Sequence, residues 1–379
     1  MLIKSNVRNL DGINMGKGYF PVIFAHVGLG EKNNLENDLE EELNKVDEAV
    51  KAGADIICDV SMHKNIELIQ QSIIKHTGAL VGGVSIYEAY INLEYDKDLV
   101  VDSSYFLTLF ERQCARGLDV VTIHATIFKD DRSLMQKSQR LIPSTSRGGI
   151  LVLEIMEKYD LDNPYYLFFD EILNIAKKYH TSISLAPTFR PASVYDAKLK
   201  DLHLLELRRM SKLCKKALKQ GVNIMIEGIG HAPLNMIKPL VKKAIKICHN
   251  VPYRVMSVAT DIAIGYDHIA SSIASSEAVY AGASSITAVT RMEHLGIPNT
   301  MDVVEGVKCA KIAAYIGYTA RTKDFSRDVK MSTSRKKEGC VGDIDAALYK
   351  DAIINYYQNK KGFCTMCGSY CPLKKERLL

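Results

Sequence analysis

Short runs of apolar and β-branched residues alternate with longer amphipathic segments along most of the chain. The short runs have the length and composition of buried strands, and the longer segments carry apolar residues at helical spacing. Predicted helices include residues 39–53, 104–116, 166–179, 202–220 and 237–248. The predicted strands span residues 20–26, 55–60, 79–85, 119–124, 181–186, 222–227, 253–258 and 284–289.

Strands that alternate with helices pair in parallel, and eight such units close into a (β/α)8 barrel. We therefore predict an α/β fold with a TIM-like barrel over residues 20–318, a lead-in over 1–19 and a C-terminal helical arm over 319–379. A doubly wound open sheet is the alternative fold. It would need a phosphate-binding glycine loop after the first strand, and residues 26–30 only faintly resemble one.

Composition narrows the class of protein. The chain has 379 residues, of which 47% are hydrophobic and 25% charged, as in ordinary globular proteins. The net charge of +5 is modest, and no nucleic-acid motif accompanies the local basic runs, so we expect no nucleic-acid partner. We find no signal-peptide-like start and no apolar run of membrane-spanning length, and therefore expect a cytoplasmic protein without a membrane partner.

Polar residues follow the predicted strands at the positions where a barrel gathers its catalytic groups. These residues are His26, Asp59, Tyr87, His124, Arg190, Glu227, His231, Asp261, Glu293 and His294. Because parallel strands end on the same face of a barrel, we expect these side chains to form one active site.

Two of these positions suggest a metal. Glu227 and His231 flank a glycine-containing turn, and His294 follows the last predicted strand in an equivalent place. A pair of histidines supplies half of a zinc or iron site, and water or substrate completes it. Glu227 is then a candidate acid, base or hydrogen-bond acceptor. A lone histidine is more often structural, so the prediction depends on the pair.

The segment 144–149, with Ser146, Arg147 and Gly148, precedes a predicted helix. Free backbone N–H groups at a helix start, together with an arginine, form a phosphate-binding arrangement. The alternative is an ordinary N-capped helix. A phosphorylated small molecule would also suit the slightly basic chain.

Three of the nine cysteines, Cys364, Cys367 and Cys371, lie near the C-terminus with the spacing C-x2-C-x3-C. Three thiolates can hold three irons of a [4Fe–4S] cluster and leave the fourth iron open for S-adenosylmethionine (SAM). A structural zinc site is an alternative, although zinc usually takes four ligands. Disulfides are the third possibility. Cys58, Cys114, Cys214, Cys248 and Cys309 fit core positions.

Taken together, the motifs resemble those of the ThiC family, the phosphomethylpyrimidine synthases of thiamine biosynthesis. The resemblance runs from about residue 20 to the C-terminus. It rests on the segments 53–59, 122–125, 146–149, 184–185, 190–191, 225–228, 230–231, 260–263, 265–268 and 293–299.

The resemblance implies a lyase that cleaves SAM reductively and rearranges 5-aminoimidazole ribotide to 4-amino-5-hydroxymethyl-2-methylpyrimidine phosphate. It also implies a homodimer, a reductant such as flavodoxin or ferredoxin, and a second divalent metal, zinc or iron. By the resemblance His231 and His294 hold that metal, and the three tail cysteines hold the cluster. The residues that would bind the ribotide are Tyr87, His124, Ser146, Arg147, Gly148, Arg190 and Glu227.

The sequence departs from the family pattern at several expected ligand positions. His26 stands where the family has asparagine, Cys58 where it has methionine, and Arg254 where it has tyrosine. A carboxylate before Arg190 is missing and the cysteine spacing is one residue shorter, and we expect no counterpart of the family's usual N-terminal domain. These changes indicate a divergent member, with His26, Cys58 and Arg254 as candidate substrate contacts.

Other functions remain open at this point. The sister activity, 5-hydroxybenzimidazole synthase, uses the same ribotide, and a paralogue could act on another phosphorylated imidazole-like substrate. A non-radical metal-dependent barrel enzyme would use His231, His294 and Glu227, with the cysteines binding zinc. A ligand sensor without catalysis is the remaining class.

Overall fold

The computed structural model describes residues 1–5, 7–96, 98–338, 342–358, 366–367 and 370–373. The chain divides into two compact units, Met1–Arg321 and Thr322–Leu379. The first unit is the barrel, and the second carries the C-terminal helices.

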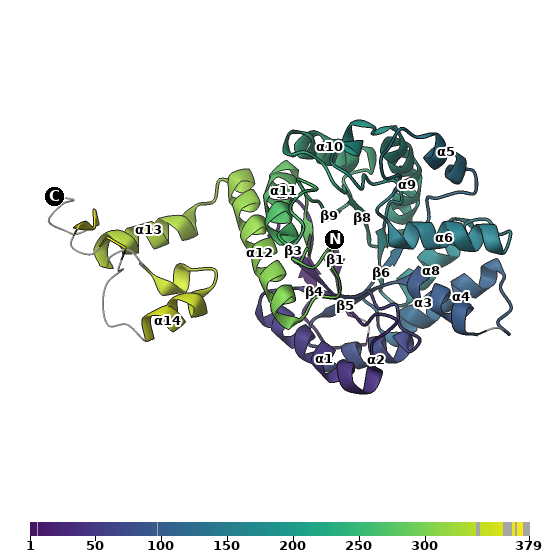
Figure 1. Cartoon of the computed structure of the whole chain (residues 1–379), viewed down its shortest axis with the longest axis horizontal. Coiled ribbons are helices and arrows are strands. Elements are labelled where there is room, and N and C mark those ends of the chain that lie inside the picture. Colours follow the sequence, from purple (N-terminus) through teal and green to yellow (C-terminus); the bar gives the residue numbers. More distant parts are fainter. Residues whose placement is uncertain (6, 97, 339–341, 359–365, 368–369, 374–379) are drawn as a thin grey trace. The chain divides into compact units, whose positions relative to one another are not determined.

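The first unit is a closed barrel of eight parallel strands in the order β10-β3-β4-β5-β6-β7-β8-β9 (Figure 1). The predicted (β/α)8 fold is therefore confirmed. The strands are β3 (Val22–Val27), β4 (Ile56–Asp59), β5 (Leu80–Val84), β6 (Val120–Ile123), β7 (Ser182–Leu185), β8 (Ile224–Gly228), β9 (Tyr253–Val255) and β10 (Ser285–Ala288).

Helices surround the strands as an outer ring (Figure 1). Their apolar faces pack on the outside of the sheet because each carries buried residues at helical spacing. They are α1 (Leu35–Lys51), α2 (Ile66–His76), α3 (Ser85–Tyr95), α4 (Ser103–Arg116), α5 (Asp131–Lys137), α6 (Arg147–Lys158), α7 (Pro164–Leu167), α8 (Phe169–Lys178), α9 (Asp201–Gln220), α10 (Leu234–Ile247), α11 (Asp267–Ala281) and α12 (Thr300–Thr322).

The interior of the barrel has its own small core. Phe24, Ile56, Leu80, Val120 and Met225 point inward and pack together. Strand residues alternate between this interior and the helical layer, as the period of two requires. The next inward positions toward the carboxyl ends include the polar residues His26, Thr122, Glu227 and Arg254, and they form the floor of the barrel mouth.

The predicted lead-in forms an ordered antiparallel pair, β1 (Leu2–Ile3) with β2 (Ile13–Asn14). Ile3 and Met15 join the interior core. Arg8 forms an ion pair with Asp119, which directly precedes β6. The pair therefore closes the amino end of the barrel, opposite to the predicted active site.

Two predicted boundaries were wrong. The helix predicted over 166–179 is divided at Phe168, which has a non-helical φ of -99° and ψ of 27°. The seventh strand ends at Val255 rather than at residue 258, and beyond it Val258 forms only an isolated bridge with His231. Both segments are rich in apolar residues, whether exposed, as Tyr166 and Leu167 are, or buried, as Val258 is, so hydrophobicity alone could not indicate the local change of backbone.

The second unit contains α13 (Ser326–Glu338), a 3-10 turn over Ile344–Ala346 and α14 (Lys350–Gln358). Arg327 donates hydrogen bonds to the carbonyls of Ala346 and Ala347, and Lys330 forms an ion pair with Asp343. These contacts hold α13 against the turn, and the predicted helical character of this part of the chain is observed.

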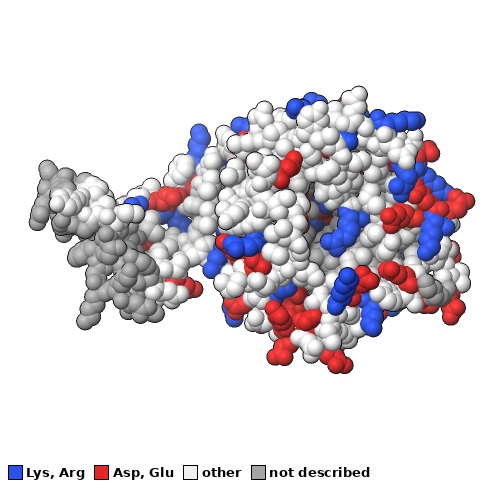
Figure 2. Space-filling model, viewed as in Figure 1, with Lys and Arg blue, Asp and Glu red and all other residues white. Residues whose placement is uncertain are grey.

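The surface carries mixed charge. On the face shown in Figure 2, acidic side chains gather over the edge formed by α1 and α2, while Lys and Arg side chains are spread among the other helices. None of the helices in the described part of the chain has the length and apolar composition required to span a bilayer.

Candidate active site

The carboxyl ends of the strands bring most of the predicted residues into one mouth. His26 of β3 lies opposite Cys58 of β4 in the parallel register, and Glu227 of β8 lies opposite Arg254 of β9. Their backbones are fixed by the closed sheet, so their side chains are positioned by rigid elements rather than by loops. His124 directly follows β6.

Glu227 is buried among donors. Ser184 and Thr122 donate hydrogen bonds of 2.8 and 3.2 Å to its Oε1, and Arg254 donates to the same oxygen. Nη1 of Arg190 lies 3.7 Å from the other carboxylate oxygen. Burial by itself would raise the pKa of Glu227, but the two guanidiniums and Ser184 outweigh it and lower the pKa to about 2. Glu227 is therefore a fixed negative charge at neutral pH.

Arg254 supports Glu227 from inside the barrel. It is buried, and its guanidinium carbon lies 4.6 Å from the centroid of the Phe24 ring. Its Nη1 lies 3.9 Å from the sulfur of Cys58. Burial raises the pKa of Cys58 to about 11, so this thiol is neutral and is a poor nucleophile.

Two imidazoles line the same space in their neutral form. Burial, reinforced by Arg254, lowers the pKa of His26 to about 3. Burial also lowers the pKa of His124 to about 3, although Glu227 opposes the shift. A neutral imidazole offers one donor and one acceptor, so both residues suit hydrogen bonding to a polar ligand.

The start of α6 faces His124. Ser146 is the N-cap, and its hydroxyl accepts a hydrogen bond of 3.2 Å from the N–H of Gly149. A Cβ placed on Gly148 would collide with the His124 ring, at 2.8 Å from Nδ1 and 2.9 Å from Nε2. Glycine is therefore required for this close approach. Arg147 adds a positive charge at a helix terminus that already favours anions.

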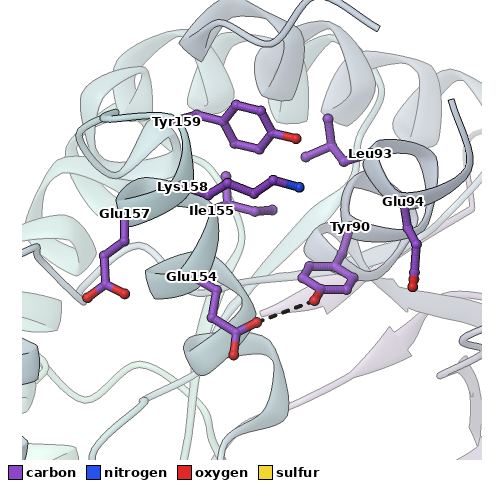
Figure 3. A pocket seen from close by; sticks show the side chains of 8 residues that line it. All are labelled: Tyr90, Leu93, Glu94, Glu154, Ile155, Glu157, Lys158 and Tyr159. Atoms are coloured by element: carbon purple, nitrogen blue, oxygen red, sulfur yellow. Dashed lines mark hydrogen bonds between the residues drawn. The ribbon is translucent and has the colours of Figure 1, made fainter. Parts of the chain in front are cut away.

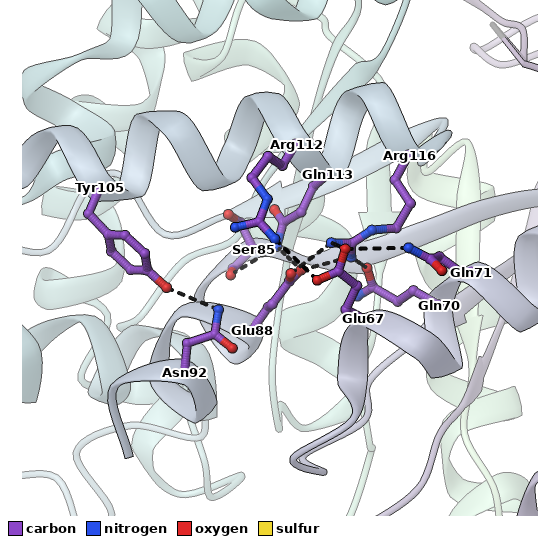
Figure 4. Close-up of polar contacts among 10 residues, drawn as sticks. All are labelled: Glu67, Gln70, Gln71, Ser85, Glu88, Asn92, Tyr105, Arg112, Gln113 and Arg116. Atoms are coloured by element: carbon purple, nitrogen blue, oxygen red, sulfur yellow. Dashed lines mark hydrogen bonds and ion pairs between the residues drawn. The ribbon is translucent and has the colours of Figure 1, made fainter. Parts of the chain in front are cut away.

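Tyr87, in the first turn of α3, lies under Arg147, whose guanidinium carbon is 5.1 Å from the ring centroid. The next residue, Glu88, points away from the mouth into a polar cluster between α2, α3 and α4 (Figure 4). There Arg116 donates to both carboxylate oxygens of Glu88 at 2.8 and 2.9 Å, and Gln113 donates at 2.8 Å. This cluster fixes the turn that carries Tyr87.

His231 and His294 come together, with ring centroids 5.3 Å apart. In each ring Nδ1 faces a carboxylate, at 2.7 Å from Asp261 and 2.9 Å from Asp267 respectively. The carboxylates orient the rings and leave each Nε2 for another ligand, which is the usual support of a metal-binding histidine. Among the described residues no group of three His, Cys, Asp or Glu side chains could hold a metal. The pair therefore fits half of a site that needs further ligands.

Asp261 and Glu293 occupy different settings. Asp261 also accepts hydrogen bonds from the backbone of Val194 at 2.9 Å and from Ser193 at 3.1 Å, so its carboxylate is committed to holding His231. Glu293 is exposed in the mouth. Partial loss of solvation raises the pKa of the Glu293 carboxyl, and the nearby His294 opposes this shift. Because the side chain is exposed, solvent screens both effects.

A cavity of about 370 Å³ opens beside this cluster. Its walls are largely glycines and apolar residues from the loops after β3, β4 and β10. The charged or titratable residues that line it are His26, Lys45, Arg147 and Glu293. The ammonium of Lys45 is buried and lies 2.6 Å from Glu42. The cavity has the volume and the polar contacts expected of a small-ligand pocket.

A second cavity of about 650 Å³ lies elsewhere, in the groove between α3 and α6 (Figure 3). Tyr90 reaches across it to Glu154, with a hydrogen bond of 3.4 Å. It is larger than the first, but it lies in the helical layer and includes none of the predicted site residues. Size alone therefore does not identify the site.

The cysteine motif is only partly described. Cys364 lies outside the described residues, while Cys367 and Cys371 are half-buried in the second unit. Whether the three thiols can share a cluster thus remains a sequence prediction. Cys58, Cys114, Cys214 and Cys248 are buried, as predicted, and Cys309 is half-buried.

Comparison with known families identifies the kind of protein. A model described as "Radical SAM ThiC family" matches residues 1–377. The chain belongs to the radical SAM ThiC family. The predicted resemblance is confirmed, and ThiC membership makes the chain an enzyme of the radical SAM class. It also implies a [4Fe–4S] cluster and SAM as cofactors and a small-molecule substrate.

Individual ThiC relatives match along nearly the whole chain. A phosphomethylpyrimidine synthase from Carboxydothermus hydrogenoformans is 36% identical over 386 residues, which cover 99% of this chain and 89% of that protein. Another from Thermodesulfovibrio yellowstonii is 32% identical over 387 residues, covering 100% and 90%.

Among solved structures, a dihydropteroate synthase from Coxiella burnetii in complex with pteroic acid superposes with a TM-score of 0.50. It shares 14% identity and covers 86% of this chain and 100% of that one. At this identity the likeness concerns the fold alone, and it supports the barrel assignment.

Several residues of the site were not predicted. Thr122 and Ser184 bind Glu227, Asp267 holds His294, and Lys45 lines the cavity. Thr122 and Ser184 lie within predicted strands, where an inward polar residue in an apolar run is a usable signal. Lys45 comes from the middle of an amphipathic helix and gives no such signal.

Proposed function

We propose that this ThiC-family chain is a phosphomethylpyrimidine synthase, a carbon–carbon lyase of thiamine biosynthesis. It would rearrange 5-aminoimidazole ribotide to 4-amino-5-hydroxymethyl-2-methylpyrimidine phosphate. The observation that carries the proposal is the start of α6 facing His124 in the barrel mouth, since it combines a phosphate-binding helix terminus with neutral polar groups for a heterocycle. Family membership supplies the reaction class.

In this proposal the phosphate binds at Ser146, Arg147 and Gly148. The N–H groups of Arg147 and Gly148 belong to the first turn, where the helix offers no internal partner. Tyr87 supports the Arg147 guanidinium from below. The ribose and the imidazole would then extend toward His124, Arg190 and Glu227.

Glu227 acts as a hydrogen-bond acceptor for the ligand and not as a base. A carboxylate whose pKa lies near 2 takes up protons poorly at neutral pH. Its charge instead orients donors such as an amino group. Glu293, which lines the cavity and is exposed, is the better candidate for proton transfer.

His26 completes the wall nearest the cavity as a substrate contact. Arg254 and Cys58, which the sequence predicted as substrate contacts, are proposed to act from behind Glu227. Asp261, predicted as catalytic, is a positioning residue in this scheme because it touches His231 rather than the pocket.

His231 and His294 would supply two ligands to a second divalent metal, zinc or iron, with the remaining positions left to other ligands. The cluster would be held by Cys364, Cys367 and Cys371. When bound, the cluster would supply an electron for the reductive cleavage of SAM. The protein's own part is to position the ribotide and exclude water.

We further propose a barrel domain over 20–318 preceded by the lead-in 1–19, and an arm over 319–379 that carries the cluster. A cytoplasmic homodimer that receives electrons from a flavodoxin or ferredoxin completes the proposal. These features rest on the family resemblance.

The test is an anaerobic reaction of the iron-reconstituted protein with reductant, SAM and 5-aminoimidazole ribotide, followed by mass spectrometry. We expect 5′-deoxyadenosine and hydroxymethylpyrimidine phosphate together. A loaded cluster that yields neither would contradict the proposal and indicate that this family member acts on another substrate.

The second candidate is the sister activity, 5-hydroxybenzimidazole synthase, or the same chemistry on a related phosphorylated imidazole. It is favoured by the buried Arg254–Glu227 pair, which changes the charge behind the ligand. The same experiment separates the candidates, because formation of 5-hydroxybenzimidazole would identify the sister activity.

A further inference from the structure

Glu206 lies on α9 and is completely buried. Its Oε1 accepts hydrogen bonds from the N–H of Thr188 at 2.7 Å and from the hydroxyl of Thr126 at 3.0 Å. Its Oε2 accepts one from the N–H of Phe189 at 2.6 Å. A side chain from the helical layer thus holds the backbone of the loop that follows β7.

The same loop is held on its other side. Ser144 donates a hydrogen bond of 2.7 Å to the carbonyl of Thr188, and Arg140 donates one of 2.8 Å to the carbonyl of Phe189. Ser144 also accepts a 3.0 Å bond from the N–H of Ser146, the N-cap of α6. The loop is therefore connected directly to the proposed phosphate site.

Packing strengthens this connection. A Cβ on Gly149, in the first turn of α6, would lie 2.6 Å from a side-chain carbon of Thr188. Thr188 and Phe189 are both fully buried. A shift of this loop would consequently displace the start of α6.

The loop continues to the histidine pair. Arg190 follows Phe189 and reaches Glu227. The carbonyl of Pro191 then accepts a 2.8 Å hydrogen bond from the N–H of His231. Over four consecutive residues the chain therefore contacts the phosphate site, the central carboxylate and the backbone of a proposed metal ligand.

We propose that Glu206 is a positioning residue that fixes the ribotide-binding half and the metal-binding half of the site in one arrangement. The inference rests on the proposed function for the identity of the two ligands. It assigns to Glu206 a role that no sequence motif suggested.

The chemistry of the contacts explains why a carboxylate is needed. All three neighbours are donors, and each oxygen accepts at least one backbone N–H. Glutamine offers a single acceptor oxygen, so its NH2 group would face a backbone N–H. Burial raises the pKa of Glu206 to about 7, and its hydrogen bonds oppose that shift because they favour the ionised form.

The test measures two affinities on the full-length, cluster-free protein by calorimetry: that of 5-aminoimidazole ribotide and that of zinc. For Glu206→Gln we expect both dissociation constants to rise by about tenfold or more, the scale of a lost hydrogen bond to a charged group. Arg190→Lys should weaken only ribotide binding, and the His231→Ala/His294→Ala double variant only zinc binding.

Asp119→Asn is the matched control. Asp119 is also buried, accepts a backbone N–H at 2.8 Å, from Val81, and forms an ion pair with Arg8. It directly precedes β6 at the amino end of the barrel, opposite to the proposed site residues. Asp119→Asn should lower the melting temperature to a similar extent and leave both affinities unchanged.

Unchanged affinities in folded Glu206→Gln, or losses equal to those in Asp119→Asn, would overturn the inference. A loss confined to one ligand would overturn the coupling between the two halves. If Glu206→Gln does not fold, Thr126→Val serves instead, because it removes one hydrogen-bond donor to Glu206. It should weaken the binding of both ligands by a smaller factor, and unchanged affinities would contradict the inference.

Failure of the proposed function has a different signature. Wild-type protein that does not bind the ribotide would contradict the function. In that case zinc and inorganic phosphate serve as the two probes. The ratio of their dissociation constants in the Glu206→Gln variant and in the wild type still decides the role of Glu206.

Discussion

Burial decides which residues in the barrel mouth carry charge. Glu227 stays ionised because two guanidiniums face it, while His26 and His124 are neutral because their burial disfavours the imidazolium. The protein thus places a permanent anion beside two neutral hydrogen-bonding rings. That combination suits recognition of an amino-substituted heterocycle.

His203, which is not one of the proposed ligand-binding residues, permits a test of how burial affects an imidazole. It is buried on α9, and burial together with Arg140 and Arg190 lowers its pKa to about 3. Between that value and the unfolded pKa of 6.5 only the unfolded chain binds the proton, so stability falls as the pH drops. His203→Gln should reduce this slope by about 1.4 kcal/mol per pH unit.

The measurement is the free energy of unfolding in urea at pH 7 and pH 5. Wild type and variant must be compared at both values, because His26 and His124 contribute to the wild-type slope as well. Equal slopes in the two proteins would show that His203 is protonated in the folded state.

Gly148 tests the close approach at α6. Alanine at this position would force the His124 ring or the helix start to move. We expect Gly148→Ala to weaken ribotide binding by roughly tenfold or more, because the displaced N–H groups no longer converge on the phosphate. Calorimetry with the ribotide measures the change.

Gly78→Ala is the control, since a Cβ there meets no atom within 4 Å. It should bind the ribotide as wild type does. Normal affinity in Gly148→Ala would remove the α6 terminus from the site.

At the scale of elements, buried ion pairs between helices fix the turns that reach the mouth. Glu88 is buried and follows Tyr87, and Arg116 of α4 binds both of its oxygens (Figure 4). The position of α3 against α4 therefore sets the position of the aromatic ring under Arg147.

Arg116→Met would leave the Glu88 carboxylate buried without its main counter-charge. We expect a loss of about 3–5 kcal/mol in the free energy of unfolding, measured in urea. Adding Glu88→Leu should recover much of it, because two apolar side chains can replace a buried pair. Lys216→Met, which breaks the exposed pair with Asp170, should cost less than about 1 kcal/mol. Equal costs for Arg116→Met and Lys216→Met would contradict the argument.

At the scale of the whole molecule, the ligand-binding residues and the cysteine motif belong to different compact units. The barrel unit ends at Arg321, and Cys367 and Cys371 lie in the second unit. Iron binding and ribotide binding should therefore be separable by mutation.

For Cys371→Ser we expect loss of most of the reconstituted iron and unchanged ribotide affinity, since the barrel unit has its own core. Iron analysis and calorimetry on the same preparation measure the two properties. Cys309→Ser, in α12 of the barrel, should retain iron. Equal iron loss in both variants would argue against the tail motif.

The sequence by itself determined the barrel, because eight β-branched runs separated by helical segments have few other ways to pair. It also indicated most of the mouth, since polar residues at strand ends, such as His26, His124 and Glu227, are marked by their place in an apolar run.

Tertiary structure alone decided how those residues act. Arg254 forms an ion pair with Glu227, and burial sets the protonation states of the site residues. From α9, Glu206 binds the backbone of the loop after β7, and from α11, Asp267 binds His294. Periodicity predicts which face of an element is buried, but not which polar groups meet once the elements pack. Those contacts depend on distances between segments that the sequence does not encode locally.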